Sequence, residues 1–241
     1  PLFLIHGIGA ARDAWRLMVP LLAGNYTCIT YDLRGHGTSP VPEGDFGLDQ
    51  LVDDLEALRE RLGIEAAHFA GHSLGGMIGP AYARKHPARV LSLGLLSTAA
   101  GRTADDSAKV WGVVRAMEEN GIENTLQTLV ARWFTDEFIA ARPEVIERRL
   151  KQVVDTNPDV FMNVFRIYAG TEMSPWLCEV EAPSLVLTGE NDGGCNPRLN
   201  RFIAGELPNA ELVILDHVKH SILIEAPDQV TAHMHRFVSS I

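Results

Sequence analysis

The chain is 241 residues long, with 46% hydrophobic and 22% charged residues, as is usual for a globular domain with one large core. Its net charge of −10 argues against nucleic acid or an anionic membrane surface as a partner. The three cysteines are odd in number and lack metal-ligand spacing, so we expect neither a disulfide framework nor a zinc site. This cysteine usage indicates a reducing compartment, so we expect a cytoplasmic protein. No apolar run is long enough to span a membrane, and no signal peptide precedes the first strand.

The chain begins on an apolar run, Leu2 to Ile5, which predicts a parallel strand buried on both faces. This strand has the pattern of a central one and no methionine precedes it, so we expect that N-terminal edge strands are missing from the sequence. The run ends in a glycine-rich loop, His6-Gly7-Ile8-Gly9. A helical signal from Trp15 to Leu22 and a second strand from Tyr26 to Tyr31 follow.

Strand and helix signals continue to alternate through the first hundred residues. A polar turn from Asp32 to Gly37 leads to a helix over Leu48 to Leu62, which Gly63 ends. The remaining elements of this part are a short strand, a glycine-rich turn, a helix and a strand, at residues 66–70, 71–76, 77–86 and 90–96. This alternation is typical of an α/β fold with a mostly parallel central sheet and helices on both faces.

The alternation stops between about residues 101 and 176, where only helical patterns occur, at residues 108–117, 125–134, 143–154 and 158–169. Strands return at residues 184–189 and 211–215, with helices near residues 198–204 and 228–238. We therefore predict an α/β core made of residues 1–100 and 177–241. Residues 101–176 are expected to form an all-helical cap, inserted before the last two strands and lying over the active site.

The glycine-rich turn Gly71-His72-Ser73-Leu74-Gly75-Gly76 has the G-x-S-x-G pattern of a nucleophile elbow, between a strand and a helix. Such a turn is so sharp that side chains at Gly71 and Gly75 would collide with neighbouring backbone, so only hydrogen fits there. The turn also holds the hydroxyl of Ser73 clear of the sheet, near the positive end of the next helix. Since this short pattern also occurs by chance, its interpretation depends on an acid and a histidine following in that order.

An acid and a histidine do follow, each on a loop after a buried strand. Asp192 comes after the next-to-last strand, where open α/β sheets place functional groups, and Glu190 ranks second because it lies nearer the strand. His217 and His220 both follow the last strand. The loop position of His220 suits a base that must reach Ser73, and His217 stays the alternative. The other histidines have structural explanations as loop, strand or helix-surface residues: His6, His36, His68, His72, His86, His233 and His235.

Together these motifs resemble the α/β-hydrolase family over essentially the whole chain. The resemblance is carried by residues 6–9, 32–39, 71–76 and 189–192, and by His220 with Glu225-Ala226-Pro227. It implies a catalytic triad of Ser73, Asp192 and His220. One departure is Lys219, which stands where a glycine commonly precedes the histidine.

Such a triad implies two-step acyl transfer, in which His220 takes the proton of Ser73 while Asp192 orients the imidazole. The backbone N–H groups of Leu74 and Ile8 are the expected oxyanion donors. We therefore expect a small-molecule substrate and water as partners, with no cofactor, no metal, no nucleic acid and no membrane. The sequence leaves the oligomeric state open, a homo-oligomer included.

Three reactive side chains near these motifs are interpreted structurally. Arg34 and His36 lie on a charged turn after a strand, and such turns usually secure loops by hydrogen bonds. The thiol of Cys195, close to Asp192, is more often a buried or incidental group than a redox-active one.

A helical cap over the carboxyl ends of the strands would line an apolar pocket for an acyl group or ring. We expect five of its residues to bind the substrate: Trp133, Phe134, Met162, Phe165 and Trp176. Because a small helical unit also needs a core, about half of the cap's aromatic and methionine residues are expected to pack it instead. Arg132 and Arg166 are candidates to meet a substrate carboxylate, although helix faces exposed to water often carry arginine.

The cap segment Ala131-Arg132-Trp133-Phe134-Thr135, followed by Arg142-Pro143-Glu144, is similar to that of 3-oxoadipate enol-lactonases. This resemblance implies a small carboxylated enol-lactone as substrate, contacted by Trp133. The first loop, with His-Gly-Ile-Gly, departs from the Asn-Ser-Leu-Gly type associated with those lactonases. Two alternatives remain: a carboxylesterase of small esters, and a hydrolase that cleaves C–C bonds in aromatic-ring fission products. A ligand-binding receptor on the same fold is the non-enzyme alternative, against which the intact triad argues.

Overall fold

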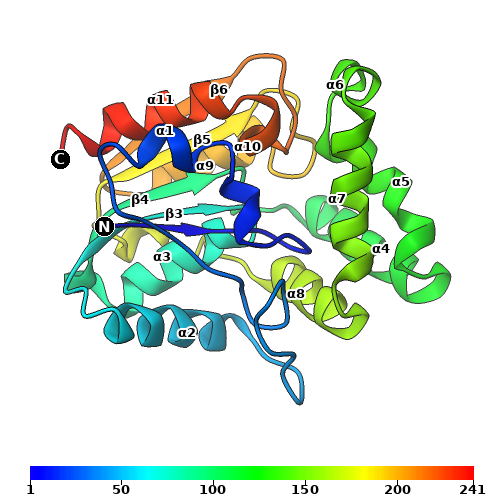
Figure 1. Ribbon diagram of the computed structural model, residues 1–241, viewed down its shortest axis with the longest axis horizontal. Helices are drawn as coiled ribbons and strands as arrows, with labels where there is room; N and C mark the ends of the chain where they lie inside the picture. The colour runs from blue at the N-terminus through cyan, green and yellow to red at the C-terminus, as the bar shows by residue number, and fades with distance from the viewer.

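The computed structural model describes residues 1–241 and contains one sheet of six strands in the order β2, β1, β3, β4, β5, β6 (Figure 1). The strand bounds are β1 Leu2–Ile5, β2 Cys28–Thr30, β3 Ala67–His72, β4 Val90–Leu96, β5 Ser184–Gly189 and β6 Ala210–Leu215. Every neighbouring pair is parallel. All six strands therefore end at the same edge of the sheet, and the loops that leave them gather there.

The sheet separates two apolar cores, because successive residues of a strand point to opposite faces. In β1, Leu2 and Leu4 belong to one core, and Phe3 and Ile5 belong to the other. The first core is covered by α1 Val19–Leu22 and α11 Pro227–Val238. The second is covered by α2 Leu48–Arg61, α3 Gly75–Lys85 and α9 Pro197–Glu206. This arrangement buries both faces of the sheet and leaves its carboxyl edge free for a site.

Five α-helices between β4 and β5 lie beyond the carboxyl ends of the strands, at the right of Figure 1. These helices, called the cap below, are α4 Ala104–Asn120, α5 Ile122–Trp133, α6 Asp136–Ala141, α7 Pro143–Asp155 and α8 Pro158–Gly170. Local signals start several of them. The Thr103 hydroxyl accepts the N–H of Asp106, and the Asp106 carboxylate accepts the N–H of Thr103, which caps α4. Pro143 and Pro158 stand at the first turn of α7 and α8, where proline fits best.

The predicted α/β fold is confirmed, with helices inserted before the last two strands. Two short helices escape the sequence pattern, α6 with 6 residues and α10 Ile222–Glu225 with 4, because so few residues cannot establish an apolar period. The helical signal from Trp15 to Leu22 is divided between a 3₁₀ helix, Arg12–Trp15, and α1. None of the helices combines the length and the apolar character that crossing a membrane requires.

Candidate active site

Ser73 lies on the turn between β3 and α3, in a backbone conformation that few side chains adopt. Its φ angle is 56°, in the left-handed region. A Cβ atom at Gly71 would overlap the backbone of Gly75, and one at Gly75 would overlap the carbonyl group of Ile5. The prediction that only hydrogen fits at these two glycines is therefore confirmed. The turn presents Ser73 at the amino end of α3, as a nucleophile elbow does.

Asp192 and His220 reach the same place from the ends of β5 and β6. Nδ1 of His220 donates to Oδ2 of Asp192 at 2.7 Å, and Oδ1 of Asp192 accepts the backbone N–H groups of Gly194 and Cys195 at 2.9 and 2.8 Å. Burial disfavours both charges, but their attraction still lowers the pKa of Asp192 and raises the pKa of His220. The carboxylate thus fixes the tautomer of the imidazole and leaves its Nε2 available to act as a base.

The competing acid and histidine lie elsewhere. The side chain of His217 is 93% exposed, and its Nδ1 is 4.0 Å from a carboxylate oxygen of Glu190. Neither residue lines the pocket that contains Ser73. Geometry therefore favours Asp192 and His220, as their positions further along the two loops predict.

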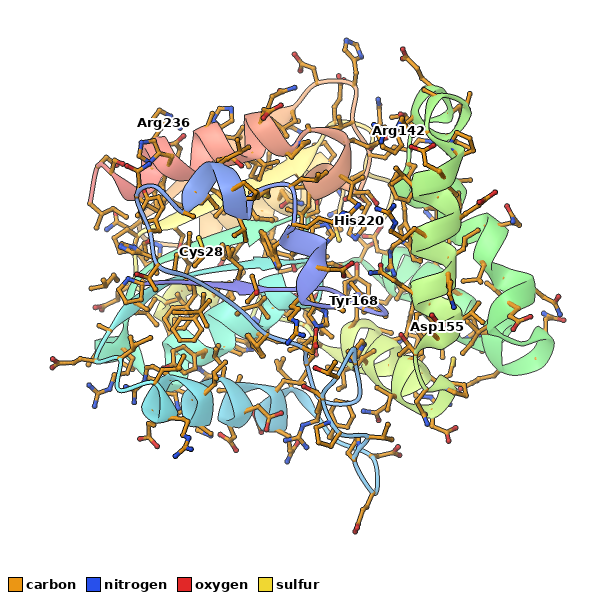
Figure 2. All side chains as sticks on the ribbon, in the orientation of Figure 1. Cys28, Arg142, Asp155, Tyr168, His220 and Arg236 are labelled. Atoms are coloured by element: carbon orange, nitrogen blue, oxygen red, sulfur yellow. The ribbon has the colours of Figure 1, made fainter.

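Ser73, Asp192 and His220 line one cavity of about 130 Å³ between the sheet edge and the cap. Figure 2 shows His220 and Tyr168 at this boundary. The Ser73 hydroxyl and the His220 ring make no hydrogen bond to each other. Such bonds are often long in free enzymes and tighten around the substrate, so this geometry is compatible with proton transfer.

The loop that carries His220 is attached to the cap on both sides of the histidine. The Ser221 N–H donates to the carbonyl of Trp133 at 2.9 Å. The ammonium of Lys219 donates to the carbonyl of Ala131 at 2.9 Å. Lys219, the departure from the family pattern, therefore anchors the loop to the end of α5. Through these bonds the cap helps to set the position of His220.

Two backbone N–H groups near Ser73 have no acceptor in the protein. They belong to Leu74, directly after the serine, and to Ile8, in the loop after β1. Both residues are buried, and a buried N–H without a partner is rare in folded proteins. Ile8 also lines the same pocket as Ser73. The two groups suit an oxyanion hole, because each is able to donate to charge that develops on a substrate oxygen.

Two buried histidines fix the loop that carries Ile8. The His6 ring donates through Nδ1 to the carbonyl of Gly7 at 2.8 Å, and its Nε2 accepts the N–H of Leu33 at 2.9 Å. Nε2 of His36 accepts the N–H of Gly9 at 3.3 Å. Burial lowers the pKa of His6 to about 3, so its ring is neutral at physiological pH. Both histidines hold loops together, in agreement with their structural interpretation.

Of the five cap residues predicted to bind substrate, two line the pocket. Trp133 and Phe165 contribute to its wall. Phe134, Met162 and Trp176 do not, so this part of the prediction is corrected. The apolar pattern of a helix shows which side chains are buried, but not whether they face a cavity or a neighbouring helix.

Each of the three excluded residues has another packing partner. Phe134 is fully buried in a small apolar cluster between α5 and α7. Met162 packs against the main core, and the ring of Trp176 lies 5.5 Å from the guanidinium of Arg84. These residues hold the cap together and attach it to the core.

The pocket also contains residues that the sequence pattern did not single out. Arg149, on α7, lines the same pocket as Ser73, and a charged residue on an amphipathic helix gives no signal of such a place. Arg132 lines the pocket too and is exposed, whereas Arg166 forms an ion pair with Glu118 at 2.7 Å and does not line it.

Two further contacts support the catalytic loops. Nε2 of His72 donates to the backbone carbonyl of His220 at 2.9 Å, and the hydroxyl of Tyr168 lies 3.2 Å from Sγ of Cys195. Asp192, Cys195 and His220 place potential metal ligands within 4.8 Å of one another. Asp192 already accepts hydrogen bonds from the imidazole of His220 and from the backbone N–H of Cys195, which brings these three residues together. All three cysteines of the chain are free thiols.

Comparisons with known proteins agree with this geometry. A family described as having the alpha/beta hydrolase fold matches residues 1–227. The chain is 29% identical to 3-oxoadipate enol-lactonase 2 of Acinetobacter baylyi, over 98% of this chain and 89% of that protein. The crystal structure of the enol-lactonase from Burkholderia xenovorans has a TM-score of 0.90 and 26% identity, covering 99% of this chain and 90% of that one. A thermophilic esterase from Thermogutta terrifontis, in a malate-bound structure, has a TM-score of 0.89 and 25% identity, covering 100% and 89%.

Proposed function

The chain belongs to the α/β-hydrolase family and is a hydrolase, and from this premise we propose that it is a serine hydrolase of small esters or lactones. Ser73 is the nucleophile, His220 is the general base and acid, and Asp192 orients the imidazole and stabilises its cation. The observation that carries the proposal is the 2.7 Å hydrogen bond from His220 to the buried Asp192, in the pocket that Ser73 lines. The bond leaves Nε2 as the ring nitrogen that receives a proton.

The reaction proceeds in two steps through an acyl-enzyme. His220 removes the proton of the Ser73 hydroxyl while its oxygen attacks the substrate carbonyl carbon. The N–H groups of Ile8 and Leu74 then donate to the oxyanion, each contributing roughly 3 kcal/mol to the stability of the transition state. The imidazolium passes its proton to the leaving oxygen, which departs and leaves an ester on Ser73. His220 next activates water, which releases the acid and restores the serine.

Within this class, the preferred substrate is a carboxylated enol-lactone, as for 3-oxoadipate enol-lactonases. Similarity to one protein named a 3-oxoadipate enol-lactonase and to the structure of an enol-lactonase, over 89% and 90% of their lengths, supports this choice. The small cavity and the ring of Trp133 in its wall suit a compact substrate. Hydrolysis of small carboxylic esters is the second candidate, which the likeness to a thermophilic esterase favours. Cleavage of C–C bonds in ring-fission products is the third reaction to compare.

Labelling with a fluorophosphonate probe tests the serine mechanism. The native protein is expected to form a covalent adduct at Ser73, because an activated serine attacks phosphorus as it attacks a carbonyl. The Ser73→Ala variant should form none and should lose turnover by about 10⁴- to 10⁶-fold. Absence of label on the native protein, or equal labelling of the variant, would refute the proposal and favour a ligand-binding protein with a silent site.

A substrate panel tests the specificity. We expect kcat/KM to be highest for enol-lactones, compared with 4-nitrophenyl esters of short acids and with dienoate ring-fission products. A higher value for the simple esters would replace the lactone assignment with a carboxylesterase, and would leave the serine mechanism intact.

A further inference from the structure

The charge of the active-site pocket is opposite to that of the whole protein. The chain carries a net charge of −10, yet three arginines line the pocket: Arg16, Arg132 and Arg149. Asp192 is the only acidic side chain in its wall, and its carboxylate is already bonded to His220. None of the three arginines forms an ion pair with a carboxylate. The pocket therefore has positive charge without a counter-ion in the protein, which attracts anions.

Arg149 is the most constrained of these arginines. From α7 its guanidinium donates to the backbone carbonyl of Ile8 at 2.8 Å and to that of Gly9. The charged group also lies over the ring of Trp133, 4.7 Å from the ring centroid. A guanidinium has five N–H donors, so the two bonds to the loop leave three for another acceptor. The group is thus held in place, with donors to spare, at the wall that Ser73 shares.

The position of Arg149 is unfavourable for a cation that has no anionic counter-ion paired with it. Burial lowers the pKa of Arg149 to about 10, and the attraction of the Asp13 carboxylate offsets this effect only in part. An enclosed charge without a counter-ion destabilises the fold, whereas a carboxylate presents two oxygens that match the guanidinium fork. Clamping the cap to two carbonyl groups uses only part of the hydrogen-bonding capacity of the side chain. A bound anion would satisfy the remainder and neutralise the charge.

We propose that Arg149 binds a free carboxylate of the substrate, so that the enzyme selects anionic esters or lactones over neutral ones. The inference rests on the proposed hydrolase function and names the residue that recognises the negative charge of the substrate. Ile8 presents its N–H to the oxyanion and its carbonyl to Arg149. The two subsites therefore meet at a single residue, and the substrate carboxylate belongs a few bonds away from the carbonyl that Ser73 attacks.

A matched pair of substrates tests the proposal. Mono-4-nitrophenyl adipate and 4-nitrophenyl hexanoate differ only in a terminal carboxylate in place of a methyl group, and spontaneous hydrolysis is subtracted. The native enzyme should show a kcat/KM roughly 10-fold or more higher for the adipate ester, as expected for a charge-assisted hydrogen bond. A native enzyme that prefers the hexanoate ester would overturn the proposal without any variant.

Substitution of Arg149 separates carboxylate binding from clamping. In Arg149→Gln, loss of the clamp lowers kcat/KM for both esters, but loss of the charge should lower the adipate value a further 10- to 100-fold or so. Arg149→Lys should keep part of the preference, because it keeps the charge and loses the fork. An unchanged ratio of the two kcat/KM values in Arg149→Gln would show that the residue only clamps the loop.

Two matched controls use neighbouring arginines. Arg148→Gln removes the same charge from an exposed position of α7 outside the pocket and should leave the ratio unchanged. Arg132→Gln changes an exposed arginine of the pocket mouth and should reduce the ratio less than Arg149→Gln does. A larger reduction in Arg132→Gln would move the carboxylate subsite to Arg132 and overturn the assignment.

Binding measurements distinguish failure of this inference from failure of the hydrolase function. Titration of Ser73→Ala with the adipate dianion, followed by calorimetry, should give binding that Arg149→Gln weakens in the same background. If neither ester is hydrolysed and the fluorophosphonate probe does not label Ser73, the hydrolase proposal fails, while binding that depends on Arg149 would still support the carboxylate site. Binding that Arg149→Gln leaves unchanged would overturn it.

Discussion

The loops at the strand ends and the cap form opposite walls of one pocket, and different forces fix them. At the strand ends backbone contacts backbone: a side chain at Gly75 would overlap the carbonyl of Ile5, and one at Gly189 would overlap the backbone of Val218. In the cap side chains contact side chains. Trp133 lines the pocket, while the next residue, Phe134, packs between α5 and α7. The first wall is therefore expected to tolerate fewer substitutions than the second.

In this proposal the strand-end loops carry the reacting groups, and the cap carries the groups that recognise the substrate. The proposed nucleophile, base and acid stand on short loops whose shape is fixed by steric exclusion. The groups proposed to recognise the substrate, Trp133 and Arg149, stand on cap helices. They contact those loops through hydrogen bonds, and a cation–π contact joins them to each other. Substitutions in the two walls are therefore expected to have effects of very different size.

The largest effect is expected at the orienting acid. Asp192→Asn should lower kcat/KM by about 10⁴-fold, because a neutral amide neither stabilises the imidazolium nor holds the required tautomer. In the native enzyme we expect kcat/KM to fall on the acid side as the proposed base, His220, becomes protonated. Since Asp192 raises the pKa of His220, that limb should have its midpoint above 6.5 and should move to lower pH in the variant. Steady-state kinetics with 4-nitrophenyl acetate across pH measure both effects.

Glu190→Gln serves as the matched control for that substitution. Glu190 follows the same strand but lies beside the exposed His217, so its loss should change kcat/KM by less than about threefold, as for an ordinary surface position. If Glu190→Gln lost as much activity as Asp192→Asn, the assignment of Asp192 as the orienting acid would be wrong.

Adding one methyl group, by a Gly→Ala substitution, should affect activity strongly at the strand-end loops and very little in the cap. Gly71→Ala places a Cβ against the backbone of Gly75 and should lower kcat/KM by at least about 100-fold, because displacement of Ser73 by even an ångström disrupts attack. Gly170→Ala, at the end of α8, meets only a ring atom of Trp111 at 3.7 Å, an ordinary contact. It should leave kcat/KM unchanged and stabilise the fold by about 0.4–1 kcal/mol, measured by urea unfolding. Full activity in Gly71→Ala would show that steric exclusion does not fix the elbow.

A smaller effect is expected within the cap. Trp133→Ala removes the ring beneath Arg149 and should lower kcat/KM by about 10-fold, since cation–π contacts contribute roughly 1 to 2 kcal/mol when desolvated. Trp176→Ala removes an equally large ring that contacts Arg84 outside the pocket, and should change kcat/KM by less than about threefold. Both variants are compared with the native enzyme on the lactone and ester panel. Equal losses would mean that cap stability, rather than contact with the substrate, explains the result at Trp133.

Much of the first wall can be predicted from the sequence. The glycines at 71 and 75 indicate the sharp turn, and buried apolar strands place Asp192 and His220 at the same edge of a parallel sheet. The two oxyanion donors are backbone groups, so their positions follow from the fold and not from side-chain identity. For the second wall the sequence predicts most helices but not their rotation, and α6, with 6 residues, gives no signal at all. Phe134, Met162 and Trp176 therefore have the same apolar pattern as the pocket residues, although they pack elsewhere.

By itself the sequence determined the strand order along the chain, the elbow at Ser73 and the succession of acid and histidine, because each depends on local periodicity or local steric exclusion. Only the tertiary structure decided which cap side chains face the cavity, how Lys219 anchors the histidine loop to α5, and that Arg149 reaches the loop of Ile8 without a counter-ion. These features join residues up to 141 positions apart. Such contacts arise when the cap docks on the sheet. The apolar period of a single helix shows which of its faces is buried, but not how that helix docks.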